Sequence, residues 1–308
     1  MRTIAAAAIA VLGLAVLPIA APWLQFVLTL AIAKGFAALG VAVLLRAGLI
    51  SIGHAMFFAA SAYSVAFLAR VGIHDLGLLL ILSVLAGGIV GAVVGSFLVR
   101  YRAIFFAMLN LAVSMVCYAL CAKLYGLTGG TDGMPVPVPT VFGVELAEPA
   151  FKSVLFYLSL ALMVLVGLSI QRYLNSPLGH ALSAVHTNEI RLEYLGIPVW
   201  AILLIAYVIS AALAGLGGAI AGFAIGRVVP DFAFWTASGH LVLIAVLGGI
   251  GGVPGAFIGA LFLELLHSAA VTVTDSWNLI VGMTLIIVIM FMPQGIYGLF
   301  TRKEASSL

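Results

Sequence analysis

Long apolar runs, separated by short polar or glycine-rich breaks, make up most of this chain. About 20 consecutive apolar residues suffice for one membrane-spanning helix, so each run predicts a transmembrane segment. The runs are continuous rather than alternating, which excludes the ~10-residue strands of a membrane β-barrel. The pattern predicts ten spans: Ile4–Ala20, Leu24–Leu45, Ala55–Leu68, Leu76–Leu98, Ala103–Cys121, Val154–Ile170, Ala201–Ala221, Phe234–Leu247, Gly255–Val271 and Leu279–Met292.

Composition supports this pattern. Of the 308 residues, 65% are hydrophobic and 7% are charged. A soluble domain carries about 25% charged residues, so this chain cannot cover a water-facing surface. We therefore expect an all-α, polytopic membrane protein of about ten transmembrane helices, forming one transmembrane domain over residues 1–308. The basic residues are scattered singly, so the net charge of +3 indicates basic loops and not a nucleic-acid surface.

The N-terminal segment allows two interpretations. Arg2, the apolar run Ile4–Val16 and the small residues Ala20 and Ala21 resemble a cleavable signal peptide. An uncleaved first transmembrane helix is the favoured interpretation. A cleaved signal would leave nine spans with the same topology.

The distribution of Lys and Arg predicts the orientation, because cytoplasmic loops are enriched in these residues. An even number of spans puts both termini on one side. That side would hold eight basic residues, namely Arg2, Arg46, Arg100, Arg102, Arg172, Arg191, Arg302 and Lys303. The opposite side would hold four, namely Arg70, Lys123, Lys152 and Arg227. We expect the side with eight to be cytoplasmic, with both termini inside.

Two connections between the spans are longer than a turn. The segment Leu124–Ala150 is expected outside and is rich in Gly and Pro. The segment Tyr173–Val199 is expected inside and has helical character. Connection alone does not require such length, so each segment is a candidate docking surface.

The inner segment predicts two short helices with a break near His186–Thr187. Ser176 followed by Pro177 is a helix-start signal. Thr187 can cap the second helix, and Glu189 would then lie in its first turn, near the positive end of the helix dipole. Gly196 can adopt the left-handed conformation that ends the second helix.

One face of this inner segment is apolar, because Leu182, Val185, Leu192 and Leu195 recur at helical spacing. Two interpretations stay open. The residues can form a hairpin that lies on the membrane, or a ridge that inserts into a groove on a cytoplasmic partner.

Catalytic and metal-binding motifs are scarce. The sequence contains no G-x-x-x-x-G-K-[ST] and no H-E-x-x-H, so the chain cannot bind ATP in the P-loop manner. If ATP drives active transport here, the ATPase must be another chain. Ser51 and His54 have the spacing of a nucleophile and its base but no third orienting group, so a turn is favoured. Cys117 and Cys121 lie one turn apart and are expected in the core, and no metal site is expected. A membrane enzyme is therefore disfavoured.

Ionisable groups within spans are costly and often functional. Lys34 lies mid-span, and Glu264 and His267 share one face of another span. We expect an ion pair between Lys34 and Glu264 near a translocation path, to which His54 and Asn110 are also assigned. The alternative is that these side chains only form hydrogen bonds between helices. His54 and His240 lie near span ends, where interfacial hydrogen bonds are favoured over ligand roles.

Eight segments, in order along the chain, resemble the LivM-type permeases of branched-chain amino-acid ABC transporters. They are residues 48–58 (GLISIGHAMFF), 105–109 (FFAML), 127–133 (LTGGTDG), 176–182 (SPLGHAL), 188–197 (NEIRLEYLGI), 210–219 (SAALAGLGGA), 246–252 (VLGGIGG) and 291–295 (FMPQG). The resemblance covers the chain from about residue 24 to residue 300.

This resemblance implies an inner-membrane permease subunit with a type II ABC importer-like fold. Its implied partners are a LivH-like second permease, two cytoplasmic ATPases that hold ATP and Mg, and a periplasmic substrate-binding protein. The segment 173–199 becomes the cytoplasmic coupling loop, and the segment 124–150 becomes a periplasmic loop. The implied ATPase contacts are His180, Leu182, Val185, Glu189, Arg191, Leu192, Glu193 and Gly196, and the implied outer mouth is Thr128, Thr131 and Asp132.

This sequence departs from the family pattern in the coupling loop. His180, Ser183 and His186 occupy positions where Arg is common, which weakens charge pairing with the ATPase. Members of the family carry branched-chain amino acids, and close relatives carry urea, short amides or aromatic acids. A different class, an ion-coupled secondary transporter that uses Lys34, Glu264 and His267, also fits the residues.

Overall fold

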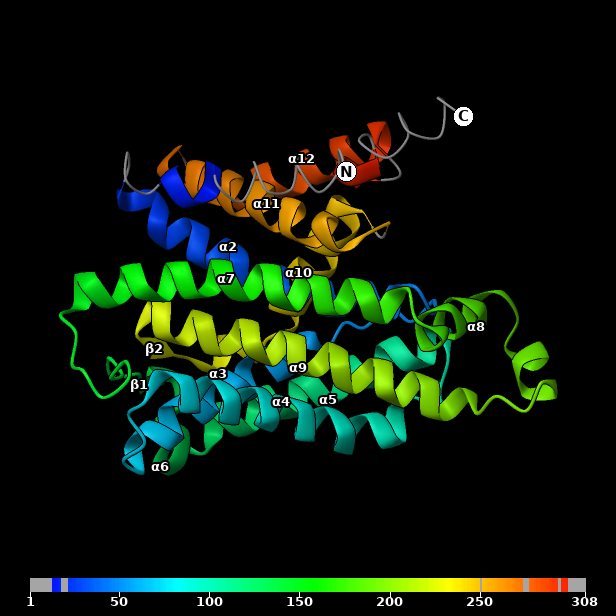
Figure 1. Cartoon of the computed structure of the whole chain (residues 1–308), viewed down its shortest axis with the longest axis horizontal. Helices are drawn as coiled ribbons and strands as arrows, with labels where there is room; N and C mark the ends of the chain where they lie inside the picture. The colour runs from blue at the N-terminus through cyan, green and yellow to red at the C-terminus, as the bar shows by residue number, and fades with distance from the viewer. Residues whose placement is uncertain (1–12, 18–21, 250, 274–276, 293–294, 299–308) are drawn as a thin grey trace.

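The apolar runs fold into long helices that lie side by side (Figure 1). The structure is a computed structural model that describes residues 13–17, 22–249, 251–273, 277–292 and 295–298. The long helices are α2 (Pro22–Leu45), α3 (His54–Arg70), α4 (Leu76–Leu98), α5 (Ala103–Lys123), α7 (Glu148–Leu174), α9 (Val199–Ile225), α10 (Trp235–Gly248), α11 (Val253–Val273) and α12 (Trp277–Phe291). Each predicted span from Leu24 onward coincides with one of them, and most of Ile4–Ala20 lies outside the described residues.

Length and apolarity qualify six described helices as membrane spans, namely α2, α4, α5, α7, α9 and α11. The predicted count of ten is therefore not confirmed. Helix α10 has 14 residues, and at 1.5 Å per residue it is about 21 Å long, less than the ~30 Å of a bilayer core. Helix α3 has 17 residues. Both adjoin a glycine-rich break, as expected.

Local signals in the sequence explain several helix ends. Asp75 caps α4, because its carboxylate accepts a hydrogen bond from the Leu78 N–H at 3.0 Å. Helix α9 ends at Gly226, whose φ of 73° is left-handed. In the non-helical connection between α2 and α3, Leu49 and Ser51 are buried and Ile50 between them is exposed.

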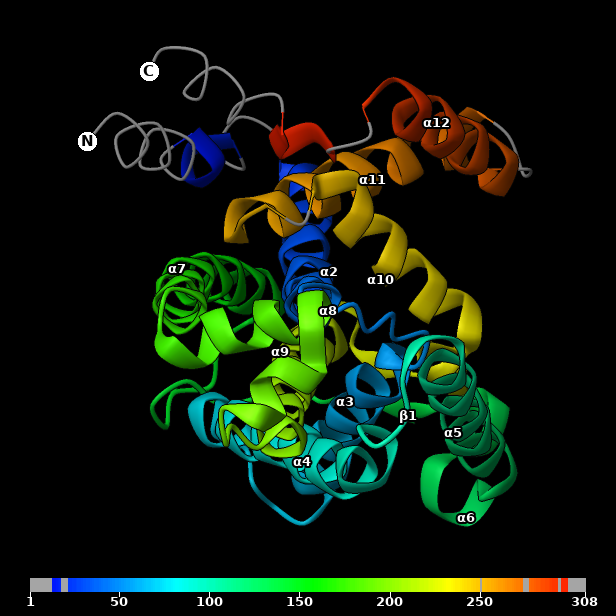
Figure 2. The same cartoon turned by 90° about the vertical axis from the view of Figure 1, so that its right-hand side faces the viewer.

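Helices α2 and α9 form the centre of the bundle (Figure 2). The most apolar window of α2 is 89% buried, against 61% for α9, 33% for α7 and 17% for α5. Glycines allow the close approach: a Cβ atom on Gly217 would overlap the Ala33 carbonyl of α2, and one on Gly218 would overlap the Phe58 carbonyl of α3. The outer helices leave apolar faces uncovered, as lipid-facing helices do.

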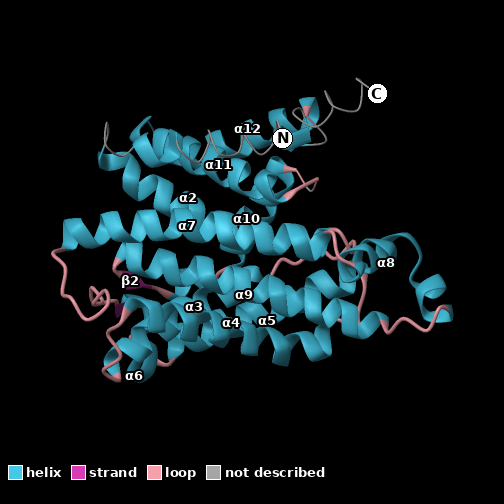
Figure 3. Ribbon diagram, in the orientation of Figure 1, coloured by secondary structure: helices cyan, strands magenta, loops and turns pink. Residues whose placement is uncertain are grey.

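The segment between α5 and α7 is more structured than the predicted loop. It contains a short helix α6 (Tyr125–Thr128), a 3₁₀ turn η1 (Gly130–Asp132) and a strand β1 (Met134–Pro135). Strand β1 pairs antiparallel with β2 (Arg227–Val228), with Met134 opposite Val228 (Figure 3). A second 3₁₀ turn, η2 (Pro230–Ala233), follows β2. The expected all-α fold thus includes this small sheet, which joins the far ends of α5 and α9.

The opposite end of the bundle carries α8 (Pro177–Tyr194), which projects beyond the long helices (Figure 1). Because the long helices alternate in direction, the α2–α3 and α4–α5 connections lie at the same end as α8. Those connections contain Arg46, Arg100 and Arg102, and Arg172 lies in the last turns of α7. Five of the eight basic residues assigned to one side of the membrane, Arg191 of α8 included, therefore lie at one end of the molecule, and Arg2, Arg302 and Lys303 lie outside the described residues.

Candidate functional site

A buried polar cluster surrounds the start of α3. His54 Nδ1 lies 2.7 Å from Ser51 Oγ, and His54 Nε2 forms a hydrogen bond with Ser210 Oγ of α9. Ser238 Oγ of α10 accepts a hydrogen bond from the Ala55 N–H at 3.0 Å. Ser51 and His54 are each 0% exposed, so a substrate has no route to the hydroxyl. This favours the turn over a catalytic pair.

Asn110 of α5 lies beside this cluster. Its Oδ1 accepts a hydrogen bond from the Tyr207 hydroxyl of α9 at 2.7 Å. Its Nδ2 is buried without a hydrogen-bond partner among the described residues. Gly53 touches the backbone of Asn110 so closely that a Cβ atom would overlap it. Asn110 and His54 are both fully buried, and their place on a translocation path stays a prediction.

Lys34 and Glu264 form the expected ion pair. Lys34 Nζ of α2 lies 2.6 Å from Glu264 Oε2 of α11, and the Glu264 side chain is 6% exposed. The two residues line a small pocket of about 90 Å³ together with His240 of α10, His267 of α11, Leu263 and Val281. The prediction of an ion pair is confirmed, and four ionisable side chains from three helices converge there.

The helix-start signal of the inner segment is confirmed, and its internal break lies one residue later than expected. Ser176 caps α8 by accepting a hydrogen bond from the Gly179 N–H at 3.4 Å. Asn188 is extended, with φ −162° and ψ 95°, and its Oδ1 accepts from the Arg191 N–H at 3.0 Å. Asn188, not Thr187, therefore caps the second half of α8. Gly196 adopts the expected left-handed conformation, with φ 74°.

The apolar face of α8 points into the protein, so at three of its four positions neither open interpretation, a hairpin on the membrane or a ridge toward a partner, describes it. Leu182, Val185 and Leu192 are buried against the rest of this chain. Leu195 is exposed, as are Ile190 and Tyr194. Helical spacing identified an apolar face correctly but could not say which protein covers it. Of the other assigned coupling residues, His180, Arg191, Glu193 and Gly196 are exposed.

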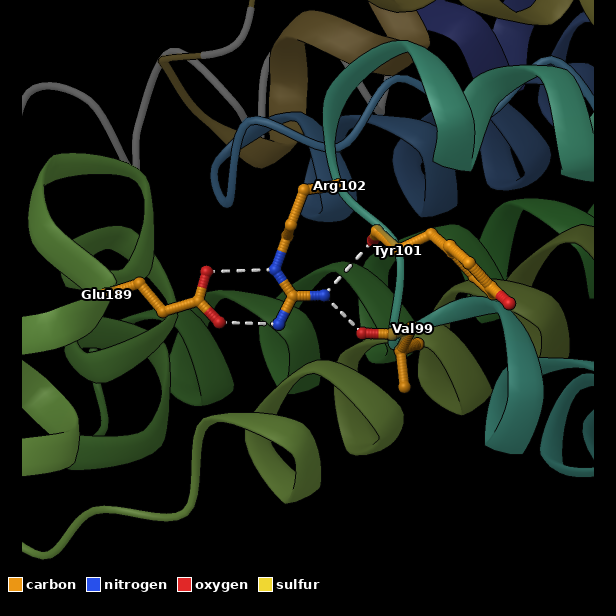
Figure 4. A network of polar contacts seen from close by, with 4 residues as sticks. All are labelled: Val99, Tyr101, Arg102 and Glu189. Carbon is orange, nitrogen blue, oxygen red and sulfur yellow. Dashed lines mark hydrogen bonds and ion pairs between the residues drawn. The ribbon is translucent and has the colours of Figure 1, made fainter.

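Glu189 forms an ion pair with Arg102 of the same chain, a contact that the sequence does not predict (Figure 4). Its two carboxylate oxygens accept hydrogen bonds from Arg102, with Nε–Oε2 at 2.9 Å and Nη2–Oε1 at 2.6 Å. The remaining nitrogen, Nη1, donates to the backbone carbonyls of Val99 and Tyr101. Glu189 was assigned to the ATPase, whereas here it joins α8 to the connection between α4 and α5. The residues are 87 positions apart, so no local pattern reveals the pair.

The assigned outer mouth divides into a buried and an exposed part. Thr128 is buried, and its hydroxyl donates to the Cys121 and Leu124 carbonyls, so it closes the end of α5 and does not line an opening. Thr131 and Asp132 are exposed. The Asp132 carbonyl accepts a hydrogen bond from Arg227 Nη1 at 2.6 Å. Cys117 and Cys121 are free thiols and are half-buried in α5, beside the core.

The described residues contain no group of three or more His, Cys, Asp or Glu side chains that could hold a metal ion. What they do contain is a bundle of membrane-spanning helices, a charged pocket inside it and a helical segment that projects from one end. These features are those of a multi-pass α-helical membrane protein.

Comparison with known proteins identifies the family. Residues 23–290 match the family model for the branched-chain amino acid transport system permease component, so the chain belongs to this family. It is 28% identical over 282 residues to the high-affinity branched-chain amino acid transport system permease protein LivM of Salmonella typhimurium (strain LT2). The LivM protein of Escherichia coli (strain K12) is also 28% identical, over 280 residues.

A second type of permease also matches. The LivH protein of Escherichia coli (strain K12) is 34% identical over 125 residues, which is 40% of each chain. The alignments with the LivM proteins cover 83% of this chain and 65% of the relatives, so the match leaves about a third of each relative uncovered. No solved structure matches the chain.

Proposed function

We propose that this chain is a transmembrane permease subunit of an ABC importer, forming half of the translocation pathway for branched-chain or related amino acids. It is a transporter subunit without its own ATPase site, and ATP hydrolysis with Mg takes place in separate chains. The family match over residues 23–290 supports this. The observation that carries it is α8, whose Leu182, Val185 and Leu192 are buried in this chain while most of its remaining surface is free.

The free face of α8 is the proposed contact with the ATPase. Ile190 is 64% exposed, Tyr194 is 88% exposed and Leu195 is 69% exposed. Together with His180, Arg191, Glu193 and Gly196 they give a surface of mixed apolar and polar character, which is common at protein interfaces. Leu182, Val185 and Leu192 support this surface from below, and Glu189 holds it in place through Arg102.

The remaining partners follow from the family. A LivH-like permease would complete the pathway, and a periplasmic binding protein would deliver substrate to the end that carries β1 and β2. We place the chain in the bacterial inner membrane with α8 and both termini in the cytoplasm. The eight basic residues assigned to that side support this orientation. Thr131 and Asp132 are then candidates for the outer mouth.

The pocket at Lys34 and Glu264 is the proposed polar part of the translocation path. A charge at membrane depth is costly, so a pair that opens into a pocket with His267 points to a role beyond packing. His54 and Asn110 would support the path from the protein interior without lining it, since both are fully buried. The alternative is an importer of the same class that carries urea, short amides or aromatic acids.

The same pocket favours a second candidate function. Lys34, Glu264 and His267 lie together between α2 and α11, as an ion-coupling site would require. An ion-coupled secondary transporter would need no ATPase. The two functions therefore differ in their dependence on partner chains.

Gentle detergent extraction, followed by identification of the co-purifying chains, separates the two functions. The importer predicts recovery of an ATPase and a second permease. Reconstituted with a binding protein, this assembly should take up radiolabelled leucine with ATP and not with a non-hydrolysable analogue. If the chain alone takes up leucine in response to an ion gradient, the importer is wrong.

The ATPase surface has its own test. Ile190→Asp and Leu195→Asp should reduce ATPase recovery, whereas Val144→Asp, an exposed apolar position at the opposite end, should not. Equal recovery with all three variants would remove this face of α8 from the interface.

A further inference from the structure

The joint between α4 and α5 has an unusual backbone conformation. Arg102 is extended, with φ −127° and ψ 164°, and Ala103, the first residue of α5, has a φ of 49°. A non-glycine residue is rarely found at positive φ, and it persists only where its surroundings hold it there. Something must therefore hold the start of α5 in this direction.

The Arg102 guanidinium provides this restraint (Figure 4). On one side it bonds to the Val99 and Tyr101 carbonyls, which end α4 and form the turn. On the other side its Nε and Nη2 form a two-bond contact with Glu189 of α8. A planar, two-bond contact between Arg and a carboxylate restricts direction as well as distance. One side chain thus joins the end of α4, the start of α5 and α8.

Glu189 belongs to the part of α8 that follows the break at Asn188. We call residues 189–195 the distal half. The distal half carries the exposed Ile190, Tyr194 and Leu195 of the proposed ATPase surface. A partner that pushes on these side chains would move the distal half about the extended residue Asn188, and Glu189 would move with it.

Helix α5 is suited to follow such a movement. Its most apolar window is 17% buried, the lowest value among the six described spans. Two side-chain hydrogen bonds join it to the core, from the Tyr207 hydroxyl to Asn110 and from Ser114 to the Ala233 carbonyl at 3.0 Å. One aromatic side chain, Phe106, is fully buried and packs edge-on against Tyr207. Displacing α5 therefore disturbs less apolar packing than displacing α2 or α9 would.

We propose that the Arg102–Glu189 pair transmits movement of the distal half of α8 to the start of α5. This inference rests on the proposed function, because the movement would come from the ATPase. Arg102 and Glu189 are positioning residues: neither is assigned to the substrate path. The pair couples ATP hydrolysis to the arrangement of the transmembrane helices.

The test measures leucine taken up per ATP hydrolysed in the reconstituted co-purified assembly. Arg102→Glu and Glu189→Arg place like charges opposite each other and should lower this ratio about tenfold, while ATP hydrolysis continues. The double variant Arg102→Glu/Glu189→Arg restores opposite charges across the joint and should recover part of the ratio, because a carboxylate at position 102 can pair with position 189 but cannot donate to the Val99 and Tyr101 carbonyls. Arg102→Lys should recover only part, since an ammonium group cannot form the two-bond contact.

Two further variants control for folding and for charge. Ala103→Gly is compatible with positive φ, so it should fold, but its looser joint should absorb the movement and lower the ratio about threefold. Lys152→Glu disrupts the exposed pair with Glu148 at the opposite end and should leave the ratio unchanged.

Each outcome decides between transmission and simple attachment. Normal coupling in Arg102→Glu and in Ala103→Gly would overturn the linkage while leaving the importer intact. Loss of ATPase binding in both single variants, without recovery in the double variant, would also overturn it, because α8 would then only be attached. No ATP-dependent uptake by the wild-type assembly would instead reject the proposed function, and the linkage with it.

Discussion

Two ion pairs in this protein share an N–O distance of 2.6 Å and differ in almost everything else. Glu264 meets Lys34 inside the bundle through a single contact, and its side chain is 6% exposed. Glu189 meets Arg102 at the end of the bundle through two contacts, and both side chains are about one third exposed.

The difference teaches what each pair can contribute. In the inner pair the Glu264 carboxylate is nearly out of reach of water while the Lys34 side chain is 31% exposed, so neutralising the Glu264 charge contributes to stable folding. At the end of the bundle water can replace the partner, so the energy of the pair is small and its geometry matters more. The first pair stabilises the helices, and the second determines how α8 is attached.

The largest effect is expected when one charge of the inner pair is removed. Lys34→Met removes the ammonium partner of the nearly buried Glu264 and should destabilise the protein by about 3 kcal/mol, the low end for a buried pair because the Lys34 side chain is 31% exposed. Glu264→Gln should act in the same direction, and the double variant should recover most of the loss. Thermal unfolding of the purified protein in detergent measures this, and unchanged melting temperatures in both single variants would contradict it.

A smaller effect is expected on transport by the neutral double variant. If Lys34 and Glu264 line the path, the stable Lys34→Met/Glu264→Gln protein should take up leucine about tenfold more slowly, because an uncharged pocket attracts a zwitterion less. Uptake per assembled complex is the measurement. A wild-type rate would assign the pair to folding alone.

The smallest effect is expected on stability when the outer pair is lost. Arg102→Ala should lower the free energy of unfolding by about 1 kcal/mol, because both partners are partly exposed. Hydrogen exchange should increase in residues 189–195, and added salt should reduce the difference from wild type. The control is Glu148→Gln, which removes the exposed ion pair with Lys152 and should leave the free energy of unfolding nearly unchanged. If Arg102→Ala costs as much as Lys34→Met, the contrast between the pairs is wrong.

The sequence was most informative where the signal was local. It located the helices from α2 onward, the start of α8 at Ser176 and its end at Gly196, because caps and apolar runs depend on neighbouring residues. It also anticipated the Lys34–Glu264 pair, since two opposite charges in apolar spans have few other partners. It failed at Glu189 and Thr128, whose partners depend on how distant segments pack and how a turn closes.

Hydropathy by itself determined that this chain is a membrane protein. Only the tertiary structure decided which helices form the interior of the bundle. Helices α2 and α5 have nearly the same mean hydropathy, 2.2 and 2.1, yet 89% of one window is buried and 17% of the other. In water, an apolar face identifies the core because the opposite face must be polar. In a bilayer, lipid and the protein interior are both apolar, so the lipid-facing side and the protein-facing side of a helix can have the same residue pattern. The close contacts of Gly217 and Gly218, and the long-range pairing of Arg102 with Glu189, resolve what the apolar pattern leaves open.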